Sequence, residues 1–147
     1  MRRRNEVVAT DTFFSDTPAI DSGVTCAQYF VGLRTRFQEI VPMPRHNDAS
    51  FVAALCEIIR KHGAPDTLYS DCAGEQVSKA TEEVLQQYMI DDGQSEPHHQ
   101  HQNLAENYYG KAKGKANCYM AWCGCPASCW LLVLMWICLP TIWHMLA

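Results

Sequence analysis

Runs of apolar and β-branched residues, broken by polar turns, predict three strands in the first third of the chain. Residues 6–14 (EVVATDTFF) are rich in Val, Thr and Phe, and residues 25–33 and 37–43 have a similar composition. A short basic turn at residues 34–36 joins the second strand to the third, which predicts an antiparallel meander. Pro42 has no backbone N–H to donate, so we expect it near the end of its strand or on an edge of the sheet.

The pattern changes to helical spacing after residue 47. Phe51, Leu55, Ile58 and Ile59 recur every three or four residues, which places them on one face of a helix. Three residues before this face are favourable caps: Asn47, Asp48 and Ser50. We therefore expect a helix that begins near them and runs to about residue 61.

Shorter elements follow this helix. They are a strand at residues 67–70, a helix at residues 75–87, a strand at residues 89–90 and, after a polar loop at residues 91–103, a helix at residues 104–113. Strands joined through helical crossovers add to a sheet in parallel. The whole order predicts an α/β fold in which a five-stranded mixed sheet, an antiparallel meander plus parallel strands, is flanked by helices.

The last third of the chain contains two segments of opposite character. Residues 110–125 (GKAKGKANCYMAWCGC) are rich in Gly and Cys, so we expect a poor helix there. Residues 129–139 are almost entirely apolar, and Pro140 interrupts the run after 11 residues. A membrane-spanning helix needs about 20 apolar residues, and the nearest Lys is Lys115, so we expect a buried helix and no membrane partner.

Charge and cysteine content narrow the class of protein only slightly. The net charge is −4, with nine acids and one base from residue 64 to residue 106 and eleven bases outside that stretch. An acidic centre with basic margins suits divalent cations beside phosphate, although an ordinary acidic domain has the same balance. No secretory signal precedes the eight cysteines, so we expect reduced thiols in a nuclear or cytoplasmic protein that is not secreted.

Three carboxylates stand in separate short motifs that suit metal chemistry. Asp11 lies in TDT near the end of the first strand, Asp71 in YSDCAGE after the fourth strand, and Glu106 in QNLAEN at the start of a helix. Mg²⁺ prefers hard oxygen ligands, and two such ions about 3.5–4 Å apart can catalyse phosphoryl transfer. Asp16, five residues after Asp11, is an alternative first acid, but its SDTP context favours a turn.

Together the three motifs resemble those of retroviral and retrotransposon integrase cores, which have an RNase H-like fold and an Asp, Asp, Glu triad. In that family about 35 residues separate the last two acids, and here 34 residues separate Asp71 from Glu106. Residues 95–106 (SEPHHQHQNLAE) resemble the lead-in of copia-type elements, with Leu104 where such elements often have Pro. The segments DTFFSDTPAIDSG and PASCWLL resemble the copia-like elements of diatoms and related algae.

The resemblance implies a DNA-joining enzyme with a two-metal site. Asp11, Asp71 and Glu106 would hold Mg²⁺ or Mn²⁺. The expected reactions are processing of the 3′ ends of retrotransposon DNA and strand transfer into target DNA, by a protein that forms a homo-oligomer. The resemblance also implies a catalytic core at residues 6–147, incomplete at its C-terminal end, after a disordered basic segment at residues 1–5.

Several other side chains have a structural interpretation beside a functional one. Lys111, Lys113 and Lys115 follow Glu106 and are candidate DNA contacts, or else a solvated basic face. A polar loop explains the histidines as well as metal binding or DNA contact does: His98, His99 and His101. One cysteine cluster has spacings that match no common zinc module: Cys118, Cys123, Cys125 and Cys129. The Trp residues are expected in the core or a dimer interface: Trp122, Trp130, Trp136 and Trp143.

Three alternatives to an active integrase core stay open at the level of the sequence. The first is a catalytically inactive retroelement fragment that only binds DNA or self-associates. A membrane-anchored protein that binds metal through Cys and His is the second, and a related nuclease of the same fold is the third. The zinc-binding domain expected upstream in integrases and a basic DNA-binding domain downstream are absent from this sequence, so descent from an enzyme is better supported than turnover.

Overall fold

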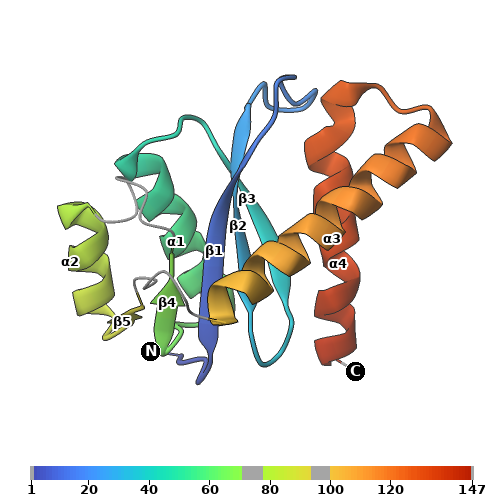
Figure 1. Ribbon diagram of the computed structural model, residues 1–147. Coiled ribbons are helices and arrows are strands. Elements are labelled where there is room, and N and C mark those ends of the chain that lie inside the picture. Colours follow the sequence, from blue (N-terminus) through green and yellow to red (C-terminus); the bar gives the residue numbers. More distant parts are fainter. Residues whose placement is uncertain (1, 71–77, 94–99, 147) are drawn as a thin grey trace.

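The structure, a computed structural model, describes residues 2–70, 78–93 and 100–146, with side chains described from residue 106 to residue 139 of the last range (Figure 1). Its centre is a five-stranded sheet in the order β3-β2-β1-β4-β5. The strands are β1 Val7–Phe14, β2 Cys26–Gly32, β3 Gln38–Met43, β4 Thr67–Tyr69 and β5 Asp91–Asp92. β1, β2 and β3 pair antiparallel, whereas β4 and β5 add in parallel, so the predicted mixed sheet is confirmed.

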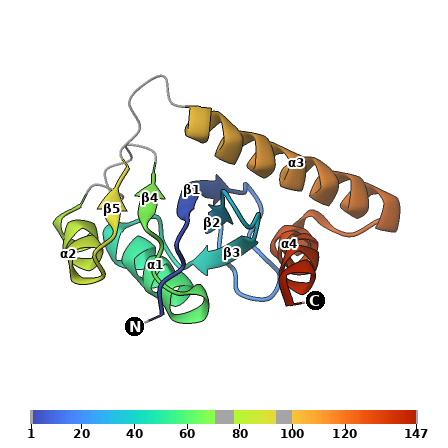
Figure 2. The same ribbon diagram turned by 90° about the horizontal axis from the view of Figure 1, so that it is seen from below.

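Helices cover both faces of this sheet (Figure 2). They are α1 Asp48–His62, α2 Lys79–Gln87, α3 Gln100–Cys123 and α4 Trp130–Leu146, with a 3₁₀ turn, η2, at Ala127–Cys129. α1 and α2 lie on one face, and α3 and α4 lie on the other (Figure 1). Of the three candidate caps Asn47 is the one used, and its side chain accepts a hydrogen bond from the Ser50 N–H at 2.9 Å.

Two separate apolar cores follow from the alternation of side chains along the strands. Phe30 on β2 packs with Phe51 and Leu55 of α1 on one face. The neighbouring residue Tyr29 packs with Trp130 of α4 on the other face. β3 is an edge strand, and Pro42 lies one residue before its end, which confirms the expectation for this proline.

The expectation of a poor helix over residues 110–125 was wrong, because α3 continues unbroken to Cys123. Gly110 and Gly114 lie on its exposed side, whereas Ala112 and Ala116 are buried against the sheet. Tertiary packing of one face therefore outweighs the low helix propensity of the glycines. α3 also begins at Gln100, inside the predicted loop, so Glu106 lies in its second turn rather than in its first.

α4 differs from its prediction in two ways. It continues through Pro140 to Leu146, although we expected Pro140 to interrupt the run. Proline costs a helix about 3 kcal/mol, and burial of Leu131 and Leu134 on the preceding turns can offset this cost. The helix is also buried on one side only, because Trp136 keeps 54% of its surface exposed. Within the described residues, no helix is both long enough and apolar enough to cross a membrane.

Smaller boundary shifts have local causes. Ser78 caps α2 and accepts a hydrogen bond from the Thr81 N–H at 3.3 Å, so that helix begins at Lys79 rather than at residue 75. The fifth strand lies at Asp91–Asp92, just after the predicted residues 89–90. Met89 has φ 51°, a left-handed conformation that turns the chain out of α2 and delays the strand.

Candidate active site

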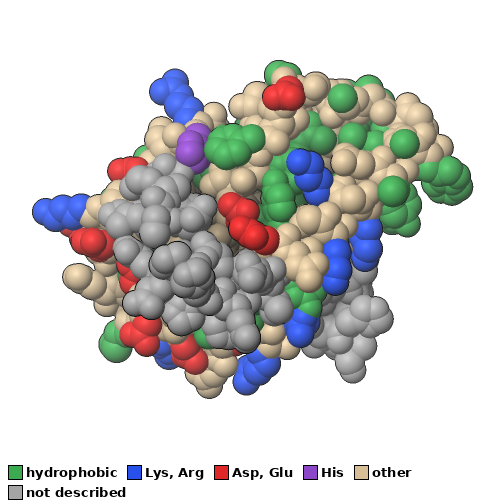
Figure 3. Space-filling model, in the orientation of Figure 1, with side chains coloured by type: hydrophobic (Ala, Val, Ile, Leu, Met, Phe, Trp, Pro, Cys, Tyr) green, Lys and Arg blue, Asp and Glu red, His purple; other side chains and the backbone are tan. Residues whose placement is uncertain are grey.

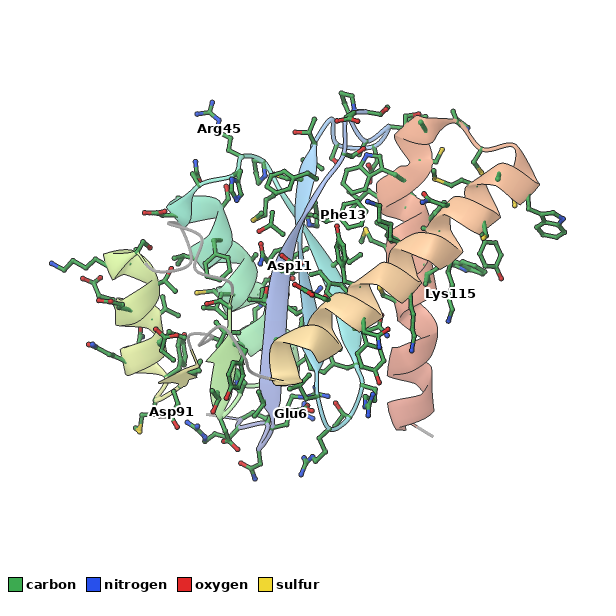
Figure 4. The ribbon with its side chains drawn as sticks, in the orientation of Figure 1. Glu6, Asp11, Phe13, Arg45, Asp91 and Lys115 are labelled. Atoms are coloured by element: carbon green, nitrogen blue, oxygen red, sulfur yellow. The ribbon has the colours of Figure 1, made fainter. Side chains whose placement is uncertain are left out.

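Asp11 lies on the central strand β1, on the face covered by α3 and α4. Its strand neighbours Ala9 and Phe13 belong to the core on that face, and side chains two residues apart on a strand point the same way. Asp11 is half-buried, and its Oδ1 accepts a hydrogen bond from the Thr12 N–H at 2.8 Å. Figure 4 places Asp11 midway along β1, where α3 crosses the sheet.

A buried polar network supports β1 from the opposite face. Gln28 on β2 is fully buried and donates from Nε2 to Thr10 Oγ1 at 2.7 Å. Thr12 Oγ1 donates to Gln28 Oε1 at 2.9 Å, and Thr10 Oγ1 donates to the Tyr29 carbonyl at 2.8 Å. A satisfied buried network of this kind fixes the register of the two strands. Because Asp11 lies between Thr10 and Thr12, the network also fixes the backbone that carries its carboxylate.

Aromatic side chains bring α3 to the same place. Tyr109 packs against Phe13 with ring centroids 5.2 Å apart and against Tyr29 with centroids 5.9 Å apart. Burial raises the pKa of Tyr109, and the nearby negative charge of Asp11 raises it further. Tyr29 is the register partner of Asp11 on β2, so the ring of Tyr109 packs beside the strand position that carries the carboxylate.

Glu106 lies on the side of α3 that carries Tyr109. Residues three apart on a helix are neighbours on its surface, so Glu106 is one turn before Tyr109. Glu106 itself is exposed. Two of the three predicted acids thus lie on the same side of the sheet, although 94 residues lie between them in the sequence.

Asp71, the third predicted acid, lies outside the described residues, as does Gly74. β4 ends at Tyr69, two residues before Asp71 in the sequence. Tyr69 lies opposite Ala9, which itself is two residues before Asp11 on β1. β4 is parallel to β1, so the described part of β4 runs in the same direction as the part of β1 that carries Asp11.

The other candidates occupy different positions. Asp16 is exposed in the bend that follows β1, beyond the part of the strand that α3 crosses. The histidine side chains of the sequence motif lie outside the described ones: His98, His99 and His101. Seven cysteines are described and all are free thiols. Within the described residues, no group of three His, Cys, Asp or Glu side chains could hold a metal ion. This search covers the described residues only, so it does not test a metal site that includes Asp71.

The three lysines of α3 do not share one face. Lys113 is four residues after Tyr109, and its Nζ lies 5.8 Å from the centre of the Phe13 ring. Lys111 lies instead beside Tyr108, with its Nζ 5.6 Å from that ring. Lys113 therefore belongs to the side of α3 that carries Glu106, whereas Lys111 and Lys115 point to the opposite edge.

The arrangement suits metal-assisted chemistry better than covalent catalysis by a nucleophilic side chain. Carboxylate oxygens are the ligands that Mg²⁺ prefers, and Asp11 and Glu106 supply them from two rigid elements. Lys113 on the same side of α3 offers a positive charge to a phosphate. Two residues that support this site were missed from the sequence. Gln28 has a signal, a lone amide within an apolar strand, whereas Tyr109 has none, because its contact with β1 is long-range.

No family model and no curated protein matches this sequence, but solved structures match its fold. The HTLV-2 integrase catalytic core in complex with magnesium, in its dimeric form, is 16% identical over 90% of this chain and 84% of its own, with a TM-score of 0.68. The BIV integrase catalytic core is 13% identical, with 90% and 82% covered and a TM-score of 0.70. A chain of the simian T-cell lymphotropic virus intasome in complex with PP2A regulatory subunit B56 gamma is 14% identical, and the match covers 91% of this chain and 49% of that one, with a TM-score of 0.71.

These identities are low, so the matches define the fold alone. The chain has the RNase H-like fold of retroviral integrase catalytic cores, with the mixed sheet and the flanking helices predicted from its sequence.

Proposed function

We propose that this chain is an integrase catalytic core, of the copia-type retrotransposon class, that joins DNA by metal-dependent phosphoryl transfer. One observation carries the proposal: α3 packs on the sheet so that Glu106 lies one turn from Tyr109, whose ring contacts Phe13 and Tyr29 on either side of the Asp11 position. β4 leads toward Asp71 from the strand position beside β1. The motif spacing of Asp71 and Glu106 supports the same assignment, and so does the fold of the HTLV-2 and BIV cores.

In this proposal Asp11, Asp71 and Glu106 hold two Mg²⁺ or Mn²⁺ ions. When bound, two such ions would activate the attacking oxygen and stabilise the leaving oxygen. The HTLV-2 core is a magnesium complex, which supports the choice of metal. The chain's own contribution is to hold its carboxylates on rigid strands and a helix, and Lys113 can bind a phosphate oxygen beside them.

The bonds changed are those of the DNA backbone. In strand transfer the 3′-hydroxyl oxygen of the element's end attacks a target phosphorus and forms a new P–O bond. The bond from that phosphorus to the 3′ oxygen of the neighbouring target nucleotide breaks, and the leaving oxygen gains the proton that the attacking hydroxyl loses. In end processing, water takes the place of the attacking hydroxyl. A nuclear or cytoplasmic location fits a protein with these substrates.

Self-association is part of the proposal. The HTLV-2 cores have dimeric and trimeric forms, and the simian virus protein forms an intasome. In this chain α4 offers a partly exposed apolar surface, on which Trp136 also packs against Tyr119 of α3 with ring centroids 5.1 Å apart. We call it the outer stripe of α4, and its members are exposed by 40–54%: Leu132, Met135, Trp136 and Leu139. A second copy of the chain is the occupant that the dimeric HTLV-2 core favours.

A strand-transfer assay tests the catalytic part. The purified chain is incubated with a labelled double-stranded DNA end and a target plasmid, with Mg²⁺, with Mn²⁺ or with EDTA. We expect joined product only with metal. Asp71→Asn, Asp11→Asn and Glu106→Gln should each lower the rate by about 100-fold or more, because each removes a negative charge that holds the metal ions.

Asp16→Asn is the matched control, since it removes an equal charge from an exposed bend near β1. It should leave the rate within about twofold of the unmodified protein. Activity that survives Asp71→Asn unchanged would sink the proposed site. A protein that binds DNA but gives no metal-dependent product would instead be the inactive fragment considered above.

A further inference from the structure

The β2–β3 turn is held in an unusual shape by a buried carboxylate. Glu6 is 4% exposed and accepts hydrogen bonds from the Arg34 N–H at 3.2 Å and the Thr35 N–H at 3.0 Å. The Thr35 hydroxyl also donates to Glu6, at 2.9 Å, and Arg4 pairs with the same carboxylate. The next residue, Arg36, has φ 63°, a left-handed conformation that L-residues rarely adopt.

This conformation directs Arg36 toward α3. The Arg36 guanidinium carbon lies 4.9 Å from the centre of the Tyr108 ring, and Lys111 Nζ lies 5.6 Å from the same centre. One aromatic ring therefore gathers two cations that come from distant parts of the chain. Lys115 is one turn beyond Lys111 on the same side of the helix. We call this surface the basic edge, and it consists of Arg36, Tyr108, Lys111 and Lys115.

The basic edge is separate from the candidate active site. Glu106, Tyr109 and Lys113 occupy the side of α3 that faces β1, whereas Tyr108, Lys111 and Lys115 occupy the other. Figure 3 shows Lys and Arg side chains following one another along α3. Lys115 is labelled on this side of α3 in Figure 4. The three cations of the basic edge are exposed, so they can reach a partner without rearrangement of the fold.

We propose that the basic edge binds the sugar-phosphate backbone of DNA, outside the catalytic site; this partner rests on the proposed function. The residues from Tyr108 to Lys115 span about 10 Å of helix. One strand of DNA carries a phosphate about every 3.4 Å along its axis, so this length meets about three phosphates and the edge offers three cations. A surface of this kind holds the duplex in position and does not read its sequence.

The test is DNA binding measured in EDTA by fluorescence anisotropy with a labelled duplex of arbitrary sequence. The triple variant Arg36→Gln, Lys111→Gln, Lys115→Gln should bind at least about tenfold more weakly than the unmodified chain. In a plot of log affinity against log salt concentration, the magnitude of the slope should fall by about 0.9 for each phosphate contact removed. The triple variant should therefore lose between about 2 and 3 in slope. Tyr108→Leu keeps every charge and should weaken binding by a smaller factor, because it only releases Arg36 and Lys111.

The matched control is the triple variant Arg45→Gln, Arg60→Gln, Lys79→Gln, whose three cations are exposed elsewhere on the molecule and whose net charge is the same. It should bind DNA nearly as the unmodified chain does. Equal loss in both triple variants, or no loss in the first, overturns the proposal, and circular dichroism checks that both are folded. No strand transfer occurs in EDTA, so the DNA-binding measurement does not depend on catalytic activity. If the basic edge proves not to bind DNA, the catalytic assignment is still tested separately by Asp71→Asn.

Discussion

Glu6 shows how one residue can organise a distant turn. Burial of its carboxylate would raise its pKa, but the hydrogen bonds from Arg4 and Thr35 and the positive charge of Arg4 outweigh burial, so the pKa is lowered. The same carboxylate lies close to Gly32, where a Cβ would collide with Glu6 and Phe37. The start of β1, the end of β2 and the following turn are thus packed around a single charge.

We expect Glu6→Gln to reduce the free energy of unfolding by about 1–3 kcal/mol at pH 7, because a charged acceptor of several hydrogen bonds is replaced by a neutral amide. The pKa of Glu6 is lower in the folded protein than in the unfolded chain. Its contribution is therefore complete above the unfolded pKa of about 4.3 and is lost as pH falls through the lower folded value. The difference between the two proteins should shrink as pH falls below about 4.

Urea unfolding at a series of pH values measures this difference. Glu39, whose pKa is also lowered, mainly by hydrogen bonds from His62 and Lys61 against the effect of burial, is present in both proteins and cancels in the comparison. Glu82→Gln, on the exposed face of α2, is the control and should change stability by less than about 0.5 kcal/mol. A Glu6→Gln protein whose deficit is independent of pH would contradict the role given to the carboxylate.

The sequence proposes the acids of the candidate site because each stands in a local motif, and their role as metal ligands stays a prediction. Asp11 follows a run of strand-forming residues, and the spacing of Asp71 and Glu106 is visible in the sequence. The residues that position them could not be predicted in this way. Tyr109 contacts Phe13 across almost a hundred residues, and the contact depends on where α3 crosses the sheet. Long-range packing of this kind is absent from local patterns.

At the scale of elements, strands were predicted better than helices. β2 is buried along its whole length because helices cover both faces of the sheet, and its apolar composition marks it as a strand. α3 was misjudged because its glycines lower helix propensity by about 1 kcal/mol each relative to alanine. The sequence gives no measure of the burial of Ala112 and Ala116, which compensates for them. Propensity is a weak guide where one helix face is covered by a sheet.

This account of α3 predicts that alanine is better than glycine at its exposed positions. A Cβ at Gly110 or Gly114 would meet no atom within 4 Å, and neither glycine has a positive φ. Gly110→Ala and Gly114→Ala should therefore each raise the free energy of unfolding by about 0.5–1 kcal/mol. Thermal unfolding followed by circular dichroism measures the change.

Gly63→Ala provides the contrast, since Gly63 has φ 92° and a Cβ there would lie 2.8 Å from the Arg2 carbonyl oxygen. That variant should lose stability. If alanine at residues 110 and 114 is neutral or destabilising, then α3 is not a continuous helix in solution at these positions.

At the scale of the whole molecule, α4 is apolar on two opposite faces. Leu131, Leu134 and Cys138 are buried against the sheet, and burial raises the pKa of the Cys138 thiol to about 12, with a smaller contribution from the charge of Glu39. The outer stripe of α4 repeats the same spacing on the other side of the helix. A helix that is apolar all round is normally buried all round, so the stripe indicates a surface that is covered in the functional protein.

The surroundings of the stripe support a protein partner with mixed character. A hollow of about 500 Å³ lies beside it, between β3, the end of α1 and α4, and Met135 and Leu139 line it. Charged side chains border the same hollow, and Lys61 Nζ lies 2.6 Å from Glu39 Oε1. An apolar centre with a charged rim is the anatomy of a protein interface.

If a second copy covers this surface, a charge within the stripe should separate the copies. Trp136→Lys places a cation at its most exposed member and should raise the dissociation constant of the dimer by about 30-fold or more, since a buried aromatic side chain at an interface contributes about 2 kcal/mol or more. Sedimentation equilibrium over a range of concentrations measures this. Phe14→Lys is the matched control, because Phe14 is also an exposed aromatic residue (58%) but lies beside His46, away from α4. This variant should leave the dissociation constant of the dimer unchanged. An unmodified chain that stays monomeric at every concentration, or equal loss in both variants, would show that the outer stripe does not bind a second copy.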